Sequence, residues 1–240
     1  MSDLDDLTEL RNRMTRFMMS YKFGLDEVTT KINILKEEFT RIHDYSPIEH
    51  VSSRLKSPES ILRKAVRKGS PLDLDGISGD VMDIAGIRVT CSFISDTYKI
   101  RDMLAQQEDL TVIREVDYIA NPKPNGYKSL HLVVEVPVFM SDRVEQVRVE
   151  VQIRTIAMDF WASLEHKIYY KYDREVPERL LDDLRQAADV ASRLDVEMER
   201  LHEEVLSLDG ATTAKDRAAA DVQAVPDQVL RAFLARPEIA

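Results

Sequence analysis

The sequence predicts an α/β (α+β) fold, with one mixed β-sheet flanked by helices and with helical extensions at both ends. Three observations support this: four strand-like runs lie close together, a helical pattern separates the first two, and three-four apolar repeats precede and follow them. With 240 residues, 44% of them hydrophobic, the chain can bury one sizeable core.

The first element is an amphipathic helix whose apolar residues recur in alternating steps of three and four. These residues are Leu25, Val28, Ile32, Leu35, Phe39 and Ile42. Ser46-Pro47 should end the helix, because the residue before a proline avoids the helical conformation. We therefore assign residues 1–45 to N-terminal helices that precede a central domain at 46–175.

A basic helix should begin near Ser57, which can cap it, with Pro58 in the first turn. Its apolar residues should point inward: Ile61, Leu62, Ala65 and Val66. Four polar residues lie three or four positions apart on one side: Lys56, Ser60, Lys64 and Arg67. That spacing suits a triphosphate, although a solvated helical face explains such a charge run equally well.

The four strand-like runs are Ile87 to Ile94, Thr111 to Tyr118, Leu130 to Val138 and Val147 to Thr155. A helix at 96–107 separates the first two, and a short loop at Ser141-Asp142-Arg143 joins the last two as a hairpin. Helices should return from Ala157 to Tyr172 and after Pro177. This order of elements predicts the mixed sheet.

The last helix, at 176–208, carries an apolar heptad repeat. Its members are Leu184, Ala187, Ala191, Leu194, Met198, Leu201 and Val205. Such a repeat favours packing between helices of one subunit or of two, and packing on the helix's own sheet is an equal alternative. The Ala, Asp and Thr-rich stretch at 209–240 is typical of a flexible tail.

The strongest functional signal lies in the last strand and the loop before the third strand. Side chains alternate along a strand, so Glu150, Gln152 and Arg154 share one face, which is either a site or a solvated surface. The loop Asn121-Pro-Lys-Pro-Asn-Gly-Tyr127 places a tyrosine among lysines. Asp83 and Glu150 are carboxylates on neighbouring strands, an arrangement that suits Mg²⁺ with substrate phosphates.

Composition excludes several classes of protein. A net charge of −10 argues against a general nucleic-acid coat protein, and neither common phosphate-loop motif is present. The acidic N-terminus and the lack of a long apolar run favour a cytoplasmic protein without a membrane partner. Cys91 is the only cysteine, in an apolar run, so we expect it to be buried and free.

Several ordered motifs resemble those of the RelA/SpoT (p)ppGpp synthetases, specifically the small, single-domain alarmone synthetases. They are Arg54-Leu-Lys-Ser-Pro-Glu-Ser60, Asp83-Ile-Ala-Gly-Ile-Arg88, Asp117 to Tyr127, Glu150-Val-Gln-Ile-Arg154 and Asp159-Phe-Trp-Ala-Ser-Leu-Glu165. The resemblance covers about Ser46 to Leu194. It implies a nucleotidyltransferase-like synthetase fold at 46–175 that moves the β,γ-pyrophosphate of ATP to the ribose 3′-hydroxyl of GTP or GDP in the stringent response.

The resemblance also implies roles for individual residues. Arg54 and Arg88 would sandwich the adenine, and four residues would hold the ATP phosphates: Lys56, Ser60, Lys64 and Arg67. Asp83 and Glu150 would hold Mg²⁺, with Glu150 as base. Tyr127 would stack on guanine, or else is an exposed turn residue. The remaining acceptor contacts would be Lys123, Asn125, Lys128, His131, Gln152 and Arg154, although His131 also fits an ordinary strand histidine.

Some features of the family are absent from this sequence or match it poorly. Only an isolated His43-Asp44 pair precedes the basic helix, so we expect synthesis without hydrolysis. The heptads favour a homo-oligomer, with a tetramer preferred, whereas the match at Lys31 to His50 leaves activation by product open. The alternatives are a toxin of the same fold that modifies tRNA or adenosine nucleotides, and a non-catalytic regulator that binds nucleotides or single-stranded RNA.

Overall fold

The structure is a computed structural model that describes residues 3–42, 45–170 and 177–211. Its contacts divide the chain into two units, Met1–Glu199 and Arg200–Ala240, and the sheet belongs to the first. The His43-Asp44 pair and residues 212–240 of the expected tail lie outside the described residues, while 209–211 still belong to the last helix. None of the described helices is long and apolar enough to cross a membrane.

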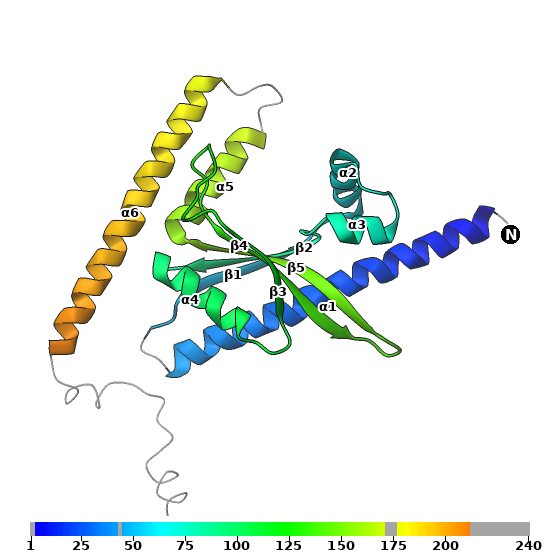
Figure 1. Ribbon diagram of the computed structural model, residues 1–240, viewed down its shortest axis with the longest axis horizontal. Coiled ribbons are helices and arrows are strands. Elements are labelled where there is room, and N and C mark those ends of the chain that lie inside the picture. Colours follow the sequence, from blue (N-terminus) through cyan, green and yellow to red (C-terminus); the bar gives the residue numbers. More distant parts are fainter. Residues whose placement is uncertain (1–2, 43–44, 171–176, 212–240) are drawn as a thin grey trace, which may run out of the picture. The chain divides into compact units, whose positions relative to one another are not determined.

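A five-stranded mixed sheet organises the first unit (Figure 1). Its strands are β1 (Ile48–Leu55), β2 (Ala85–Cys91), β3 (Thr111–Asp117), β4 (Leu130–Phe139) and β5 (Val144–Thr155). The order across the sheet is β1-β2-β5-β4-β3, and only the β2–β5 pair is parallel. The fold class predicted from the sequence is confirmed, as is the β4–β5 hairpin.

The expectation of four strands was wrong, because it missed β1. The three apolar residues of β1, Ile48, Val51 and Leu55, lie three and four positions apart, which is the spacing of a helix. The strand lies at the edge of the sheet and pairs only with β2. Five of its eight residues are exposed, so an edge strand of this kind needs few apolar residues and its sequence carries little strand signal.

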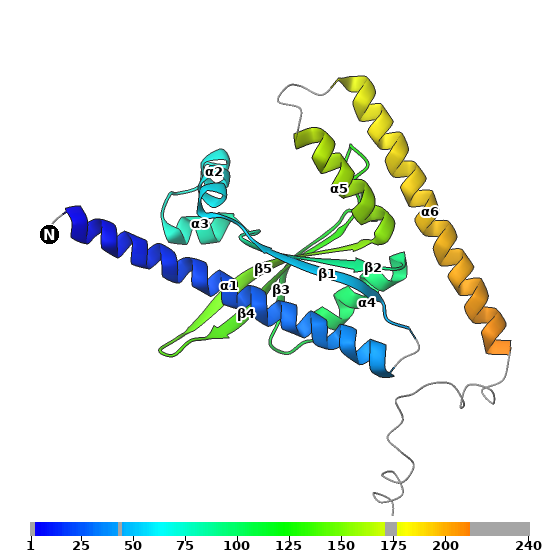
Figure 2. The same ribbon diagram turned by 180° about the vertical axis from the view of Figure 1, so that it is seen from behind.

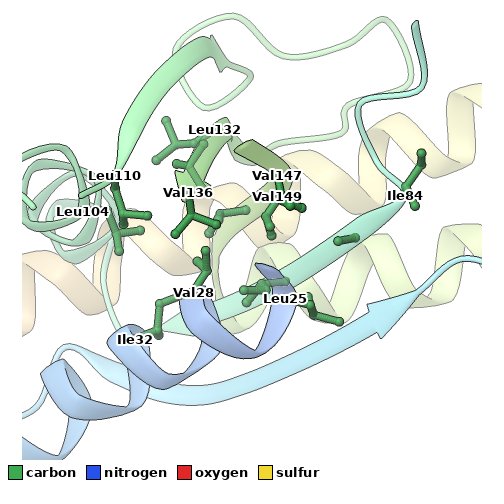
Figure 3. Packing of buried hydrophobic residues seen from close by; sticks show 14 of the residues in the cluster. Leu25, Val28, Ile32, Ile84, Leu104, Leu110, Leu132, Val136, Val147 and Val149 are labelled. Carbon is green, nitrogen blue, oxygen red and sulfur yellow. The ribbon is translucent and has the colours of Figure 1, made fainter. Parts of the chain in front are cut away.

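One face of the sheet carries the hydrophobic core, which α1 (Asp3–Ile42) and α4 (Ile94–Ala105) cover. Figure 2 shows α1 lying across the strands, and Figure 3 shows Val28 and Ile32 of α1 near Val136 of β4. A Cβ on Gly24 would lie 2.5 Å from Val147 Cγ1, so a glycine is needed for this close approach. Of the expected apolar stripe, Leu25, Val28 and Ile32 are buried, but Ile42 is 70% exposed, so the end of the helix does not pack on the core.

Two short helices connect β1 to β2: α2 (Pro58–Lys68) and α3 (Leu74–Asp80). The cap at the start of α2 is confirmed, because Ser57 Oγ accepts a hydrogen bond from Ser60 N. Ile61 and Ala65 are buried as expected, but Leu62 and Val66 are exposed, because a helix this short packs along only one narrow stripe. The sequence did not predict α3, because two of its seven residues are glycines, which disfavour helices.

The chain after the sheet forms α5 (Ile156–Tyr170) and α6 (Glu178–Ala211), which begins in the first unit and ends in the second. The heptad repeat does not describe how α6 packs. Of its members in the first unit, Leu184 is buried and Ala191 half-buried, whereas Ala187, Leu194 and Met198 are exposed. The buried residues Leu184, Ala188 and Asp195 instead define the packed face. Cys91 is buried and free, as expected.

Candidate active site

The sheet face opposite the core carries polar side chains from neighbouring strands, which the strand register places in two rows. Arg54, Gly86 and Glu150 form one row. The next row runs through Ser52, Arg88, Gln152 and His131. Because residues two apart in a strand share a face, both rows point to the same side. Strand pairing therefore brings together candidate residues that are far apart in the sequence.

A basic groove of about 370 Å³ lies beside these rows. Its lining is Arg54, Leu55, Lys56, Ser57, Ser60, Arg63, Lys64 and Arg67. The four residues expected to bind phosphates are among them, but Lys56 precedes α2 rather than lying on it. Its backbone N–H donates to Ile84 O at 2.8 Å, which fixes it beside the loop before β2. The shape and charge of the groove suit a polyphosphate.

Arg63 also lines the groove, although it was not among the predicted site residues. The sequence did contain a signal for it. Arg63 stands three residues after Ser60 and four before Arg67, so helix geometry places all three on one side.

Asp83 lies in the loop between α3 and β2 and is bound by two lysines. Its Oδ2 pairs with Lys56 Nζ at 2.8 Å and with Lys64 Nζ at 2.6 Å. Burial alone would raise the pKa of this carboxyl, but the hydrogen bonds and charges of the two lysines outweigh it and leave the pKa below its usual value. Asp83 is therefore ionised, while its buried Oδ1 has no hydrogen-bond partner.

Glu150, at the middle of β5, is the second carboxylate of the site. Its Oε2 accepts from Gln152 Nε2 at 2.7 Å, and its Oε1 lies 3.7 Å from His131 Nδ1. Burial would raise the pKa of Glu150, but His131 and the Gln152 amide hold it below its usual value. Glu150 is thus a second ionised carboxylate, and its side chain is 17% exposed.

Asp83 and Glu150 line one cavity of about 140 Å³ together with Lys64, His131 and Tyr118. Nowhere in the described residues do three histidine, cysteine or acidic side chains gather as a metal cage. Mg²⁺ in phosphoryl chemistry needs only one or two carboxylates, because substrate phosphates and water supply its other ligands. The unpartnered Asp83 Oδ1, with a second ionised carboxylate lining the same cavity, therefore fits this ion.

Arg54 and Arg88, the residues expected to hold the adenine, flank a shallow cavity of about 170 Å³ over β1 and β2. Gly86 forms part of the floor, and a Cβ there would lie 3.9 Å from Arg54 Cγ. Arg88 is fixed by an ion pair of 3.2 Å to Asp159 on α5, and its buried Nε has no partner. The two guanidinium groups therefore border one space that is open to a planar ring.

Tyr127 belongs to an aromatic cluster rather than to an exposed loop tip. Its hydroxyl lies 2.7 Å from His131 Nε2 and accepts from Arg154 Nη2 at 2.6 Å. The rings of Tyr118 and His131 pack edge-on to it, and Lys123 Nζ lies 4.7 Å from its ring centroid. Burial raises the pKa of Tyr127, against the lowering effect of Arg154. The alternative of an exposed turn tyrosine was therefore wrong.

Arg154 organises this half of the site from a buried position, with a residue exposure of 4%. Besides Tyr127, it donates to Gln152 Oε1 at 2.8 Å and to Ser129 Oγ at 3.4 Å. Its Nη1 pairs with Asp159 Oδ1 at 3.1 Å, so Asp159 joins Arg154 to Arg88. Asp159 begins one of the sequence motifs, but the sequence alone predicted no role for it. The sequence feature that could have identified Asp159 is its place in the first turn of α5, the helix that directly follows β5.

Two residues expected at the acceptor are engaged by the helices instead. Lys128 Nζ donates to Ser192 Oγ on α6 at 2.5 Å. Asn125 shapes the loop, because its Oδ1 accepts from Tyr127 N at 3.2 Å while its Nδ2 donates to Glu165 on α5 at 3.1 Å. Asp117, also missed, holds the start of the same loop by accepting from the backbone of Ile119 and Ala120.

Comparison with known proteins identifies the family. The family model described as "Region found in RelA / SpoT proteins" matches residues 53–175. The chain belongs to the RelA/SpoT family. Among curated relatives it is 50% identical over 202 residues to GTP pyrophosphokinase YwaC of Bacillus subtilis. The aligned region covers 84% of this chain and 96% of YwaC.

Solved structures of small alarmone synthetases that resemble this chain include complexes with nucleotides. Small alarmone synthetase 1 of Bacillus subtilis bound to its product pppGpp is 40% identical, with a TM-score of 0.76 over 81% of this chain and 99% of that one. The same enzyme bound to AMPCPP is 38% identical, with a TM-score of 0.69 over 82% of this chain and 99% of that one.

Proposed function

We propose that the polar face of the sheet makes (p)ppGpp, by transferring the β,γ-pyrophosphate of ATP to the 3′-hydroxyl of GTP or GDP and releasing AMP. The chain is a GTP pyrophosphokinase of the small alarmone synthetase type. One observation carries the proposal: two ionised carboxylates face one cavity between a basic groove and an aromatic cluster. Two nucleotides placed on either side would meet at the carboxylates. This synthetase domain is expected to occupy 46–175.

The donor nucleotide would occupy the basic groove and the shelf beside it. Arg54 and Arg88 would hold the adenine between their guanidinium planes. Lys56, Ser60, Lys64 and Arg67 would bind the phosphates, with Arg63 as an added cation. Because Lys56 and Lys64 are paired with Asp83, they would exchange this partner for phosphate oxygens when ATP binds.

The reaction centre would lie at Asp83 and Glu150, which would hold Mg²⁺. The ion would neutralise charge on the transferred group when bound. Glu150 would accept the proton of the attacking 3′-hydroxyl. The 3′-oxygen would form a bond to the β-phosphorus of ATP as the bond between that phosphorus and the α,β-bridging oxygen breaks. That oxygen leaves with AMP. A pKa below its usual value leaves Glu150 ionised at neutral pH, which is the form in which a carboxylate can act as a base.

The acceptor would bind on the other side of the carboxylates. Tyr127 would stack on guanine, held in orientation by Arg154 and His131 through its hydroxyl. Lys123 lies beside the ring and would meet the acceptor's phosphates, and His131 and Gln152 would complete the polar wall. Asn125 and Lys128 would act by shaping the loop.

A homo-oligomer, with a tetramer favoured, is the expected assembly. An apolar groove of about 1010 Å³ between α5 and α6 supports this. Phe160, Leu194 and Met198 line it and are exposed in the single chain, and apolar patches of this kind typically mark protein interfaces. We expect the protein to act in the cytoplasm and to lack hydrolase activity.

The pure protein should be incubated with ATP labelled at the γ-phosphate, with Mg²⁺ and, separately, GTP, GDP, GMP or deacylated tRNA. Chromatography should show label in a guanosine tetra- or pentaphosphate, and Glu150→Gln should lower its formation at least about a hundredfold. Label on tRNA alone would favour the toxin alternative. An absence of transfer, with a shift of single-stranded RNA on a gel, would favour the regulator.

A further inference from the structure

One face of α6 contacts the loop at 118–129, here called the acceptor loop, which joins β3 to β4. Residues at 185, 188, 192 and 195 recur every three or four positions and so share a side of the helix. Arg185 Nε donates to Pro124 O at 2.7 Å, and Lys128 Nζ donates to Ser192 Oγ at 2.5 Å. Further along, Asp195 accepts from Thr155 at the end of β5 at 2.7 Å. The helix thus follows the loop from its tip to the sheet.

Gly126 makes the closest approach between loop and helix. Its φ of +89° lies in the left-handed region that favours glycine, and its N–H donates to Lys123 O at 2.8 Å to close a tight turn. A Cβ at this position would lie 2.5 Å from Ala188 Cβ. Only a glycine facing a small residue allows the turn to lie directly on α6.

These contacts determine where the Tyr127 ring lies. The ring packs against a small apolar cluster formed by Trp161 and Ala162 of α5 with Leu184 and Ala188 of α6. The Trp161 indole N–H donates to Leu184 O at 3.0 Å, which joins the two helices beneath the loop. Arg185 is oriented by Asp182 at 2.5 Å, so its bond to the loop comes from a fixed guanidinium. Movement of α6 would move the tyrosine.

We propose that α6 positions the acceptor loop, and that Arg185 is a positioning residue that controls affinity for the acceptor nucleotide. This rests on the proposed function, in which Tyr127 stacks on guanine. Arg185 touches no candidate substrate group and acts through the Pro124 carbonyl. The donor groove is built from β1 and α2, so it does not depend on these contacts.

The test compares Arg185→Ala with Arg185→Lys and with the control Arg193→Ala. Arg193 is an exposed arginine on the same helix, so its loss removes the same charge without the contact to the loop. Loss of a hydrogen bond from a charged donor should raise the KM for GTP or GDP about tenfold in Arg185→Ala. The KM for ATP and kcat should change less than about twofold, and Arg185→Lys should recover most of the affinity.

Hydrogen exchange supplies a readout that is independent of turnover. The amides of Lys123 and Gly126 should exchange faster in Arg185→Ala than in the parent and in Arg193→Ala, because the turn loses its support. Binding of AMPCPP should be unchanged in all three variants, which shows that they are folded.

The outcomes separate this inference from the function on which it rests. If the parent protein transfers pyrophosphate but Arg185→Ala and Arg193→Ala have the same acceptor KM and the same exchange, the positioning role is overturned. An equal rise in the KM for ATP would also overturn it, because the effect would then be structural. If the parent transfers nothing, the proposed function fails first and the inference fails with it.

Discussion

Replacing Asp83 by asparagine should abolish synthesis and yet strengthen the binding of ATP when no divalent cation is present. Asp83 is the shared partner of Lys56 and Lys64, and all three side chains are at least three-quarters buried, with exposures of 13%, 15% and 25%. In the free protein the carboxylate therefore competes with the phosphates for both lysines. Asparagine keeps the size of the side chain but removes that competing charge.

The size of the effect follows from the geometry. Lys64 Nζ lies 2.6 Å from the carboxylate. A phosphate oxygen bound on its far side would lie about 2.8 Å from the same nitrogen, which places the two negatively charged oxygens at most about 5.4 Å apart. At an effective dielectric of about 20, one pair of unit charges at that distance repel by about 3 kcal/mol. Screening and partial loss of lysine order reduce this, so we expect about 1.4 kcal/mol, a tenfold gain in affinity.

Isothermal titration calorimetry with ATP in EDTA would measure this, with Asp80→Asn as the control. Asp80 is an exposed aspartate three residues away, so its substitution changes the net charge equally without freeing the lysines. With Mg²⁺ present the order should reverse, and AMP release by Asp83→Asn should be undetectable. Equal or weaker binding of metal-free ATP by Asp83→Asn, compared with the parent, would refute competition for the lysines.

Three further outcomes are expected. Tyr127→Ala should raise the acceptor KM about tenfold or more in steady-state assays, with a smaller effect for Tyr127→Phe, which keeps the ring; an unchanged KM would argue against stacking. Arg154→Met should destabilise the fold by about 3 kcal/mol or more, seen as a Tm lower by about 10 °C, because it leaves buried partners unpaired; a shift below about 2 °C would contradict a buried network. Burial raises the pKa of Asp195 despite its bond from Thr155, so its contribution to stability is present below about pH 4 and is lost as the pH rises through the folded-state pKa. Asp195→Asn should therefore gain Tm over the parent between about pH 4 and pH 7, and a constant difference across that range would exclude this linkage.

The sequence was informative where one periodicity dominated a segment. The alternation at Val149 to Arg154 predicted both the strand and the polar face that carries Glu150, and the cap at Ser57 predicted the start of α2. Prediction from the sequence was wrong where the local apolar pattern differs from the structure that the segment adopts in the fold. β1 carries apolar residues at helical spacing and becomes a strand only because β2 offers a free edge.

The same limit applies to the site. The candidate residues could be chosen because their chemistry is visible in the sequence, but their partners depend on pairing across the fold. Nothing local indicates that Lys128 turns toward Ser192, or that Asp159 joins two arginines from different strands. The packed face of α6 was misplaced for a related reason, because Ala188 and Asp195 are buried against a loop and a strand end rather than against another apolar stripe.

The two halves of the site differ in how far they are organised before substrate binds. On the acceptor side, Arg154 is buried and donates to Tyr127, Gln152 and Asp159, so the groups that would read the guanine are already in place. On the donor side, Lys56 and Lys64 form ion pairs with Asp83, and these pairs would have to break before Asp83 could bind a metal ion. Selectivity for the acceptor can therefore rest on a rigid surface, whereas affinity for ATP depends on an exchange of ionic partners. Substitutions on the acceptor side should lower stability and acceptor affinity together. A single substitution of Lys56 or Lys64 should lower donor affinity, while the other lysine still neutralises Asp83 and limits the loss of stability.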